Sequence, residues 1–141
     1  MEQRSVTWGN TARAAQVYRQ QGVESASPLD LVVRVFDEAL RNLALARTAL
    51  ANRQAALKGD HVHRVCRCLD VLQSALNMEQ GGEVARNLDR LYSYLQSRLT
   101  QGHLRNDDEA FGEVASHLAE LGSAWREAAE RPAATPTEGS R

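Results

Sequence analysis

The spacing of the apolar residues does most to decide what this 141-residue chain can fold into. In four segments they recur at every third or fourth position, which is the period of an α-helix, and no segment alternates as a half-buried strand does. The four rows are Leu29, Val33, Phe36, Leu40 and Leu43; Val62, Val65, Leu69, Leu72 and Leu76; Val84, Leu88, Leu91, Leu95 and Leu99; and Phe111, Val114, Leu118, Leu121, Trp125 and Ala128. Each helix must bury its apolar face against the others. The sequence therefore predicts an all-α protein, an antiparallel four-helix bundle.

Local signals set the expected ends of the first two helices. Ser27 suits an N-cap, Pro28 suits the first helical position, and Asp30 completes a capping-box spacing. The helical pattern then continues to a turn that we expect at residues 58–60, Lys-Gly-Asp. The second helix is expected from about residue 60 to about residue 77.

Glycine, proline and capping residues likewise set the expected ends of the last two helices. The adjacent glycines at 81–82 suit a tight connection between antiparallel helices. The third helix follows, and Gly102 lies where we expect it to end. Asn106 or Asp107 is expected to cap the fourth helix, which Pro132 stops.

Composition divides the chain into three parts. Residues 1–26 are polar and lack a sustained apolar period, so we expect a flexible N-terminal arm. Residues 27–131 hold the four helical rows and are expected to form one bundle domain. Residues 132–141 have too little apolar surface to offset their ordering entropy, and we expect a disordered tail.

The segment 59–68, GDHVHRVCRC, raises the question of a zinc site, because imidazole and thiolate are the usual ligands of zinc. Its residues lie on one predicted helix, where Cys68 falls inside the apolar row while His63 and Cys66 fall outside it. His61 lies at the start of the helix, near the edge of the row. This spacing favours Cys68 as a small core residue and no metal site. A metal-dependent bundle that uses this segment is the alternative.

Several classes of function find no support in the sequence. The 17 basic and 18 acidic residues nearly cancel, and no basic cluster with interleaved aromatics indicates a nucleic-acid partner. No apolar run reaches the length of a membrane span and no signal sequence is evident, so we expect a protein of the cytosol. No nucleophile, phosphate-binding or di-iron motif is present, and we expect neither an enzyme nor a cofactor. The lone pair Glu113 and His117 is expected to be a solvated surface pair.

The first and third helices carry more apolar and aromatic surface than a bundle core requires. A second row on the first helix is turned by roughly 100° from the row through Phe36. This second row is Leu31, Val35, Ala39 and Ala46. On the third helix Tyr94 lies away from the apolar row, beside Asn87 and Arg98. These residues are expected either to form a groove for a partner or to meet neighbouring helices and the N-terminal arm.

Four segments of the sequence resemble a known family in order and over nearly the whole chain, from about Ala14 to Glu130. The segments are YRQQGVESASPLDLV, VFDEAL, MEQGGEVARNLDRLYSYLQSRL and LRNDDEAFGEVASHLAELGSAWREA. They closely resemble the FliS family of flagellin-specific export chaperones. The resemblance implies a cytosolic chaperone without ATP chemistry. Such a chaperone binds the C-terminal region of flagellin, prevents its premature polymerisation and delivers it to the flagellar type III export apparatus.

The resemblance also implies a set of partner-binding residues. They are Tyr18 in the arm, Arg67 on the second helix, and Asn87, Tyr92, Tyr94 and Arg98 on the third. We add Leu31 and Val35 from the second row of the first helix as candidates for the groove. The alternative function is a helical adaptor or regulator that binds another flagellar protein rather than flagellin.

Overall fold

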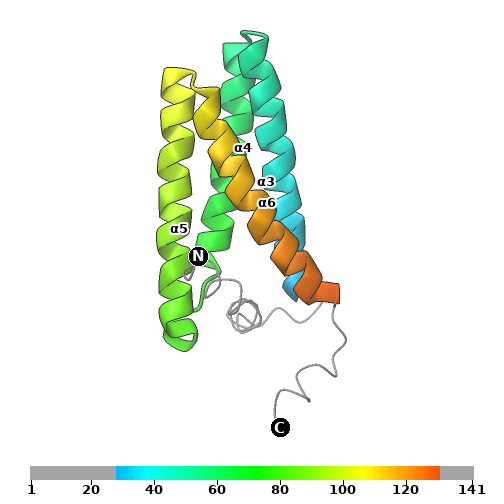
Figure 1. The fold of residues 1–141 in the computed structure, drawn as a ribbon, viewed down its shortest axis with the longest axis vertical. Coiled ribbons are helices and arrows are strands. Elements are labelled where there is room, and N and C mark those ends of the chain that lie inside the picture. The colour runs from blue at the N-terminus through cyan, green and yellow to red at the C-terminus, as the bar shows by residue number, and fades with distance from the viewer. Residues whose placement is uncertain (1–27, 131–141) are drawn as a thin grey trace.

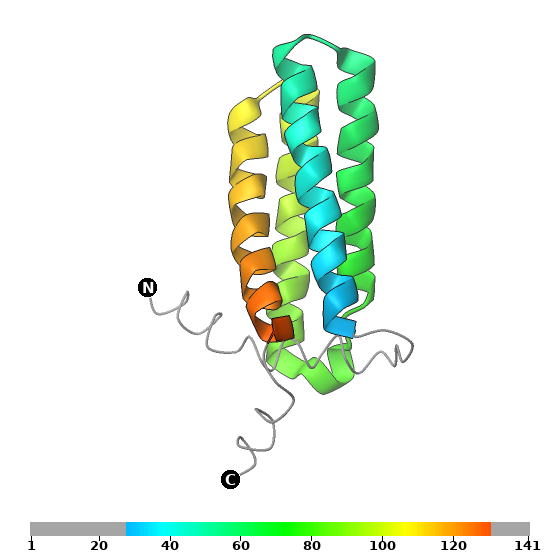
Figure 2. The same cartoon turned by 90° about the vertical axis from the view of Figure 1, so that its right-hand side faces the viewer.

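The computed structural model describes residues 28–130, which form four helices and no strand. The helices are α3 (Pro28–Ala51), α4 (Ala55–Ser74), α5 (Met78–Arg105) and α6 (Asp108–Glu130). Figures 1 and 2 show them as one antiparallel bundle. Around it, α3 packs against α4 and α6, and α5 packs against the same two helices. The predicted all-α bundle is confirmed for this part of the chain. The expected arm (1–26) and tail (132–141) lie outside the described residues.

The core consists of one inward row from each helix, and two of these rows differ from the predicted ones. On α3 the fully buried residues include Ala39 and Ala46, whereas Leu40 is only half-buried. Two residues that were assigned to the second row of this helix are therefore core. On α5 the buried row is Ala85, Leu88, Tyr92, Leu95 and Leu99. The predicted row used Val84 and Leu91, which instead pack on its edge. In both helices the buried positions alternate steps of three and four, which keeps a row facing its neighbours.

The turn between α3 and α4 lies at residues 52–54, and the turn predicted at 58–60 is wrong. Arg53 takes the left-handed conformation that reverses the chain, with φ of 56°. The N–H of Gln54 then donates to the carbonyl oxygen of Ala49 at 2.9 Å. Lys58 and Gly59 are helical because the first turn of α4 is held against α5. There the buried Lys58 ammonium donates to the carbonyl oxygen of His103 at 3.0 Å.

The connection between α4 and α5 ends before the glycines at 81–82, which the sequence placed in it. It occupies residues 75–77, and α5 begins at Met78, where the Asn77 side chain accepts from the N–H of Gln80 at 2.9 Å. Gly82 then kinks the helix with φ of 55° and ψ of −129°. The glycines therefore bend the start of α5 and do not separate two helices. A left-handed residue in this position suits glycine, which has no Cβ to clash.

The turn between α5 and α6 confirms one of the two predicted caps. Asn106 ends α5 in the left-handed conformation, with φ of 53°. The Asp107 side chain accepts from the N–H of Glu109 at 3.0 Å, so Asp107 caps α6. Gly102 does not end α5, which continues to Arg105. From this tight turn α6 runs diagonally towards the start of α3, and α5 and α6 diverge along their length (Figure 1).

Candidate partner-binding surface

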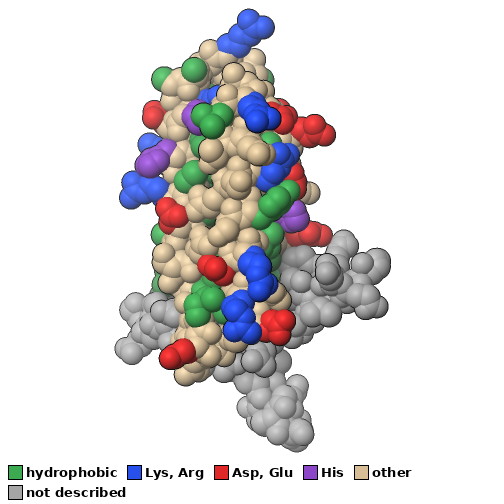
Figure 3. Space-filling view, turned by 90° about the vertical axis from the view of Figure 1, so that its left-hand side faces the viewer, with side chains coloured by type: hydrophobic (Ala, Val, Ile, Leu, Met, Phe, Trp, Pro, Cys, Tyr) green, Lys and Arg blue, Asp and Glu red, His purple; other side chains and the backbone are tan. Residues whose placement is uncertain are grey.

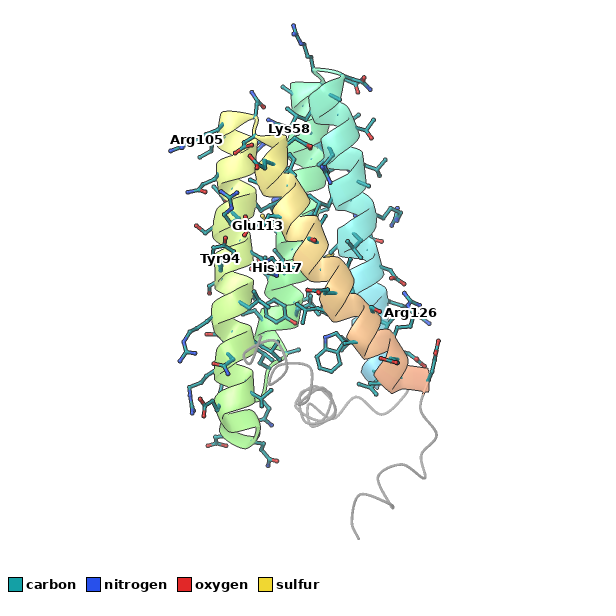
Figure 4. All side chains as sticks on the ribbon, viewed as in Figure 1. Lys58, Tyr94, Arg105, Glu113, His117 and Arg126 are labelled. Carbon is teal, nitrogen blue, oxygen red and sulfur yellow. The ribbon has the colours of Figure 1, made fainter. Side chains whose placement is uncertain are left out.

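A cluster of four polar side chains joins α5 to α6 at the surface of the bundle. We call Tyr94, Arg98, Glu113 and His117 the Glu113 cluster. The Arg98 Nε donates to Glu113 Oε1 at 2.7 Å, and the Tyr94 hydroxyl donates to Glu113 Oε2. Figure 4 shows Tyr94 on α5 and Glu113 and His117 on α6, close to the seam between the two helices. One carboxylate therefore holds an arginine and a tyrosine from the neighbouring helix.

His117 completes this cluster from the same side as Glu113. Its Nε2 lies 4.0 Å from Glu113 Oε2, and its ring stands edge-on to Tyr94 with centroids 6.4 Å apart. Both Glu113 and His117 are partly exposed, which confirms the predicted surface position, but Glu113 is bound by two side chains of α5 and the pair is not simply solvated. The sequence did not indicate that Tyr94 and Arg98 of α5 meet them. The spacing of four residues between Glu113 and His117 indicates that they are neighbours on one helix, and it says nothing about contacts with another helix.

The electrostatics of the cluster keep Glu113 ionised. The hydrogen bonds from Tyr94 and then from Arg98 lower the pKa of the Glu113 carboxyl below its usual range. Conversely, the Glu113 carboxylate accepts a hydrogen bond from the Tyr94 hydroxyl. This bond stabilises the protonated tyrosine and raises the pKa of Tyr94. A carboxylate that accepts two hydrogen bonds is stabilised in its charged form. At neutral pH the surface of α5 therefore presents a protonated tyrosine and a cationic arginine, both bound to one anion.

The remaining residues that were expected to bind a partner are not gathered at this cluster. Leu31 and Val35 are half-buried on α3, which lies across the bundle from α5 and is not its packing neighbour. Arg67 is exposed on α4. Asn87 is exposed on α5, where its side-chain oxygen accepts from Arg90 at 2.7 Å. Tyr18 lies outside the described residues.

Tyr92 belongs to the core and not to an exposed surface. It is fully buried, whereas Tyr94, two residues later, is 45% exposed. The helical period explains the difference, because Tyr92 is four residues from Leu88 and three from Leu95, both in the buried row. Of the two tyrosines, Tyr94 alone has a side chain that a partner can reach in this conformation.

The histidines and cysteines of the segment 59–68 lie on different sides of α4. Both Cys66 and Cys68 are free and half-buried and pack against the core, so the predicted contrast between a core Cys68 and a flanking Cys66 is wrong. The buried row of α4 runs through Val65 and Leu69, and the two cysteines flank it on opposite sides, each roughly 80° from its centre. Among residues 28–130, no three His, Cys, Asp or Glu side chains are arranged to hold a metal ion.

His61 contacts a polar side chain of α3. Its Nδ1 lies 2.9 Å from the side-chain oxygen of Asn42, so this nitrogen carries the proton and donates. Asn42 is 1% exposed, and its amide nitrogen donates to the carbonyl and carboxylate oxygens of Glu38, both at 3.0 Å. His63 is exposed on the outer face of α4. Nothing in the sequence indicated this part-buried link between α3 and α4, since Asn42 and His61 lie 19 positions apart.

No helix within the described ranges is long and apolar enough to cross a membrane.

Comparisons with known proteins match most of the chain to one family. The family described as "Flagellar protein FliS" matches residues 10–132. The flagellar secretion chaperone FliS of Salmonella typhimurium is 39% identical over 114 residues, which cover 80% of this chain and 84% of that protein. The flagellar secretion chaperone FliSB of Pseudomonas aeruginosa is 35% identical over 117 residues, covering 80% and 93%. The FliS protein of Escherichia coli is 34% identical over 126 residues, covering 86% and 93%.

Proposed function

Because the chain belongs to the FliS family of flagellar secretion chaperones, we propose that it is a cytosolic export chaperone for flagellin. In this proposal it binds the C-terminal region of flagellin, prevents premature polymerisation and delivers the subunit to the flagellar type III export apparatus. It acts by binding alone, without catalysis and without a cofactor.

The observation that carries the proposal is the outer surface of α5. A helical bundle needs only apolar side chains for its core, and α5 supplies them with one buried row. The same helix carries on its outer side the exposed Tyr94 and the partly exposed Arg98, held by Glu113. Tyrosine and arginine are the residue types most enriched where proteins bind one another. The half-buried Leu31 and Val35 on α3 offer a second, apolar contact.

Binding alone is enough for such a chaperone. A cargo segment that orders only when it is bound loses conformational entropy, so its affinity per unit of interface is low and release needs no chemical step. A bundle surface with apolar and polar contacts on several helices can hold a segment in this way. The proposal therefore requires no nucleotide.

Co-purification tests the cargo and the region bound. The full chain is mixed with flagellin, and in a parallel sample with flagellin truncated before its C-terminal region. We expect a stable complex with the first and none with the second. Equal retention of both forms, or of neither, would contradict the proposal and favour an adaptor that binds another flagellar protein.

Delivery is tested separately in cells. Deleting the gene in its own organism is expected to leave less flagellin in the medium and more aggregated or degraded flagellin in the cell, while the export of hook proteins continues. Unchanged flagellin export would contradict the assigned role in delivery.

A further inference from the structure

One outer face of α5 holds basic and hydrogen-bonding side chains in a row. We call Arg90, Tyr94, Arg98, Gln101 and Arg105 the basic row. Their spacing places them within a sector of roughly 80° over about 22 Å of helix. The one acidic residue of α5 between positions 87 and 105 is Asp89, which faces α4 and accepts from Gln73 at 2.8 Å. In Figure 3, which faces α5, basic side chains are spaced along much of this helix.

The centre of the basic row already holds a carboxylate. Glu113 of α6 accepts from Tyr94 and from Arg98 Nε, while an Arg98 terminal nitrogen donates to the side-chain oxygen of Gln101 at 2.8 Å. Two donors of the row, Tyr94 and Arg98, thus point at one anion, and Gln101 accepts a hydrogen bond from the same arginine. Arginine hydrogen bonds to carboxylates are among the strongest that proteins make. The group that the centre of the row binds is therefore a carboxylate, supplied by Glu113 of the same chain.

Among the described residues, no carboxylate bonds to the arginine at either end of the row. Arg90 donates to the neutral amide of Asn87 at 2.7 Å. Within residues 28–130, Arg105 forms no ion pair, and Figure 4 shows its side chain projecting from the end of α5. Three acidic residues follow this end in the sequence: Asp107 caps α6, Asp108 pairs with Arg47, and Glu109 is exposed. Within residues 28–130, Glu113 is thus the one carboxylate hydrogen-bonded to the three guanidinium groups of the row.

We propose that the basic row is a docking surface for an acidic segment of a protein partner, with Glu113 holding the central carboxylate position until that segment displaces it. The proposal rests on the proposed function only in taking α5 as a partner-binding face. Carboxylates spaced along the segment would pair with Arg90, Arg98 and Arg105. Charge complementarity of this kind speeds association and selects among partners. Displacing a charged group of the same chain makes the binding competitive and reversible.

Fluorescence anisotropy with a labelled peptide of ten glutamates tests the row. At about 0.01 M salt, where screening extends over about 30 Å, we expect binding to the full chain that weakens as salt is added. Replacing Arg90 and Arg105 together by alanine should weaken it by about fivefold. Glu113→Gln removes the competing charge and should strengthen binding by about threefold. The control for lost positive charge is Arg64→Ala, an exposed arginine on α4, which should weaken binding much less.

Three results would overturn the proposal. The first is that the peptide does not bind at low salt. The second is that Arg64→Ala weakens peptide binding as much as the replacement of Arg90 and Arg105 does. The third is that a ten-residue oligothymidylate binds as tightly as the peptide and depends on the same arginines. The last result would indicate a nucleic-acid surface. Thermal melts confirm that each variant is folded, and Arg90 and Arg105 contribute nothing to the core. Because the probe is not flagellin, the peptide can fail to bind while flagellin still binds, and the two proposals can fail separately.

Discussion

At the scale of single residues, burial alone does not show what a position tolerates. Gly102 and Gly59 are both helical glycines, but their surroundings differ. A Cβ on Gly102 would lie 2.8 Å from Phe111 Cδ1, whereas one on Gly59 would meet nothing closer than 3.6 Å. The end of α5 can approach the start of α6 because residue 102 has no side chain.

Gly102→Ala is therefore expected to destabilise the fold by about 1 to 3 kcal/mol, because overpacking outweighs the gain in helix propensity. Gly59→Ala, the matched control, should be neutral or stabilise by up to about 1 kcal/mol. Urea melts of both variants measure the difference. A Gly102→Ala protein as stable as the parent chain would contradict the close packing against Phe111.

The two thiols are expected to react slowly. Burial raises the pKa of Cys66, with Asp70 adding to the effect, and burial followed by the charge of Glu38 raises the pKa of Cys68. A raised thiol pKa means less thiolate at neutral pH, so alkylation should be slower in the native protein than in urea and should accelerate as pH rises. Iodoacetamide labelling with mass spectrometry follows both sites. Native rates equal to those in urea would contradict this burial.

At the scale of the helices, buried polar contacts tie the ends of elements together. Lys58 is 5% exposed, and its ammonium donates to the carbonyl oxygen of His103 and the side chain of Asn106. A cation at the end of α5 satisfies carbonyl groups that the helix cannot bond itself. This contact joins the first turn of α4 to the last turn of α5, at the end where α5 also turns into α6.

Lys58→Met keeps the apolar stem and removes the ammonium, so it isolates the hydrogen bonds. We expect a loss of about 1 to 3 kcal/mol, because the carbonyl oxygen of His103 and the side chain of Asn106 lose their donor in a part-buried contact. Urea melts of Lys58→Met beside Arg64→Met, an exposed position on the same helix, measure the effect. Equal stability of the two variants would show that the Lys58 contacts contribute nothing.

The same contact predicts a pH dependence. Burial, and then the charge of Lys58, lowers the pKa of His103, so the folded state favours the neutral ring. In the unfolded chain His103 takes up its proton near pH 6.5, its ordinary pKa. The stability that the neutral His103 ring gives the folded state is therefore present above about pH 6.5 and is lost as pH falls below it. Stability from urea melts at falling pH should decline less in His103→Gln than in the parent chain. An identical decline would contradict the role of His103.

At the scale of the whole molecule, a residue of a binding surface and a residue of the core differ in whether a substitution lowers binding or stability. Val35 is half-buried at the start of α3, and Val71 is 53% exposed on α4. Val35→Asp is expected to weaken flagellin binding by about tenfold or more while the melting temperature falls little, since a charge in an apolar contact excludes the partner. Val71→Asp is the control for added charge. If Val35→Asp lowers stability as much as binding, its face is core.

Much of the molecule was predictable because helical periodicity is local. Rows such as Val65, Leu69 and Leu72 show which face of a helix is apolar without knowledge of any neighbour. The capping role of Asp107 was also predictable, since its partner is two residues away. Placing Leu40 in the core failed because Leu40 and Ala39 are both apolar. The choice between them depends on how closely the next helix approaches.

The sequence by itself determined four amphipathic helices and their common core, because burying apolar faces constrains every arrangement of this chain in the same way. The tertiary structure alone decided that Glu113 meets Tyr94 and Arg98, that His61 meets Asn42, and that Lys58 is buried. Polar contacts between helices depend on the crossing and axial offset of two elements. These quantities follow from packing across the whole bundle and leave no period in the sequence.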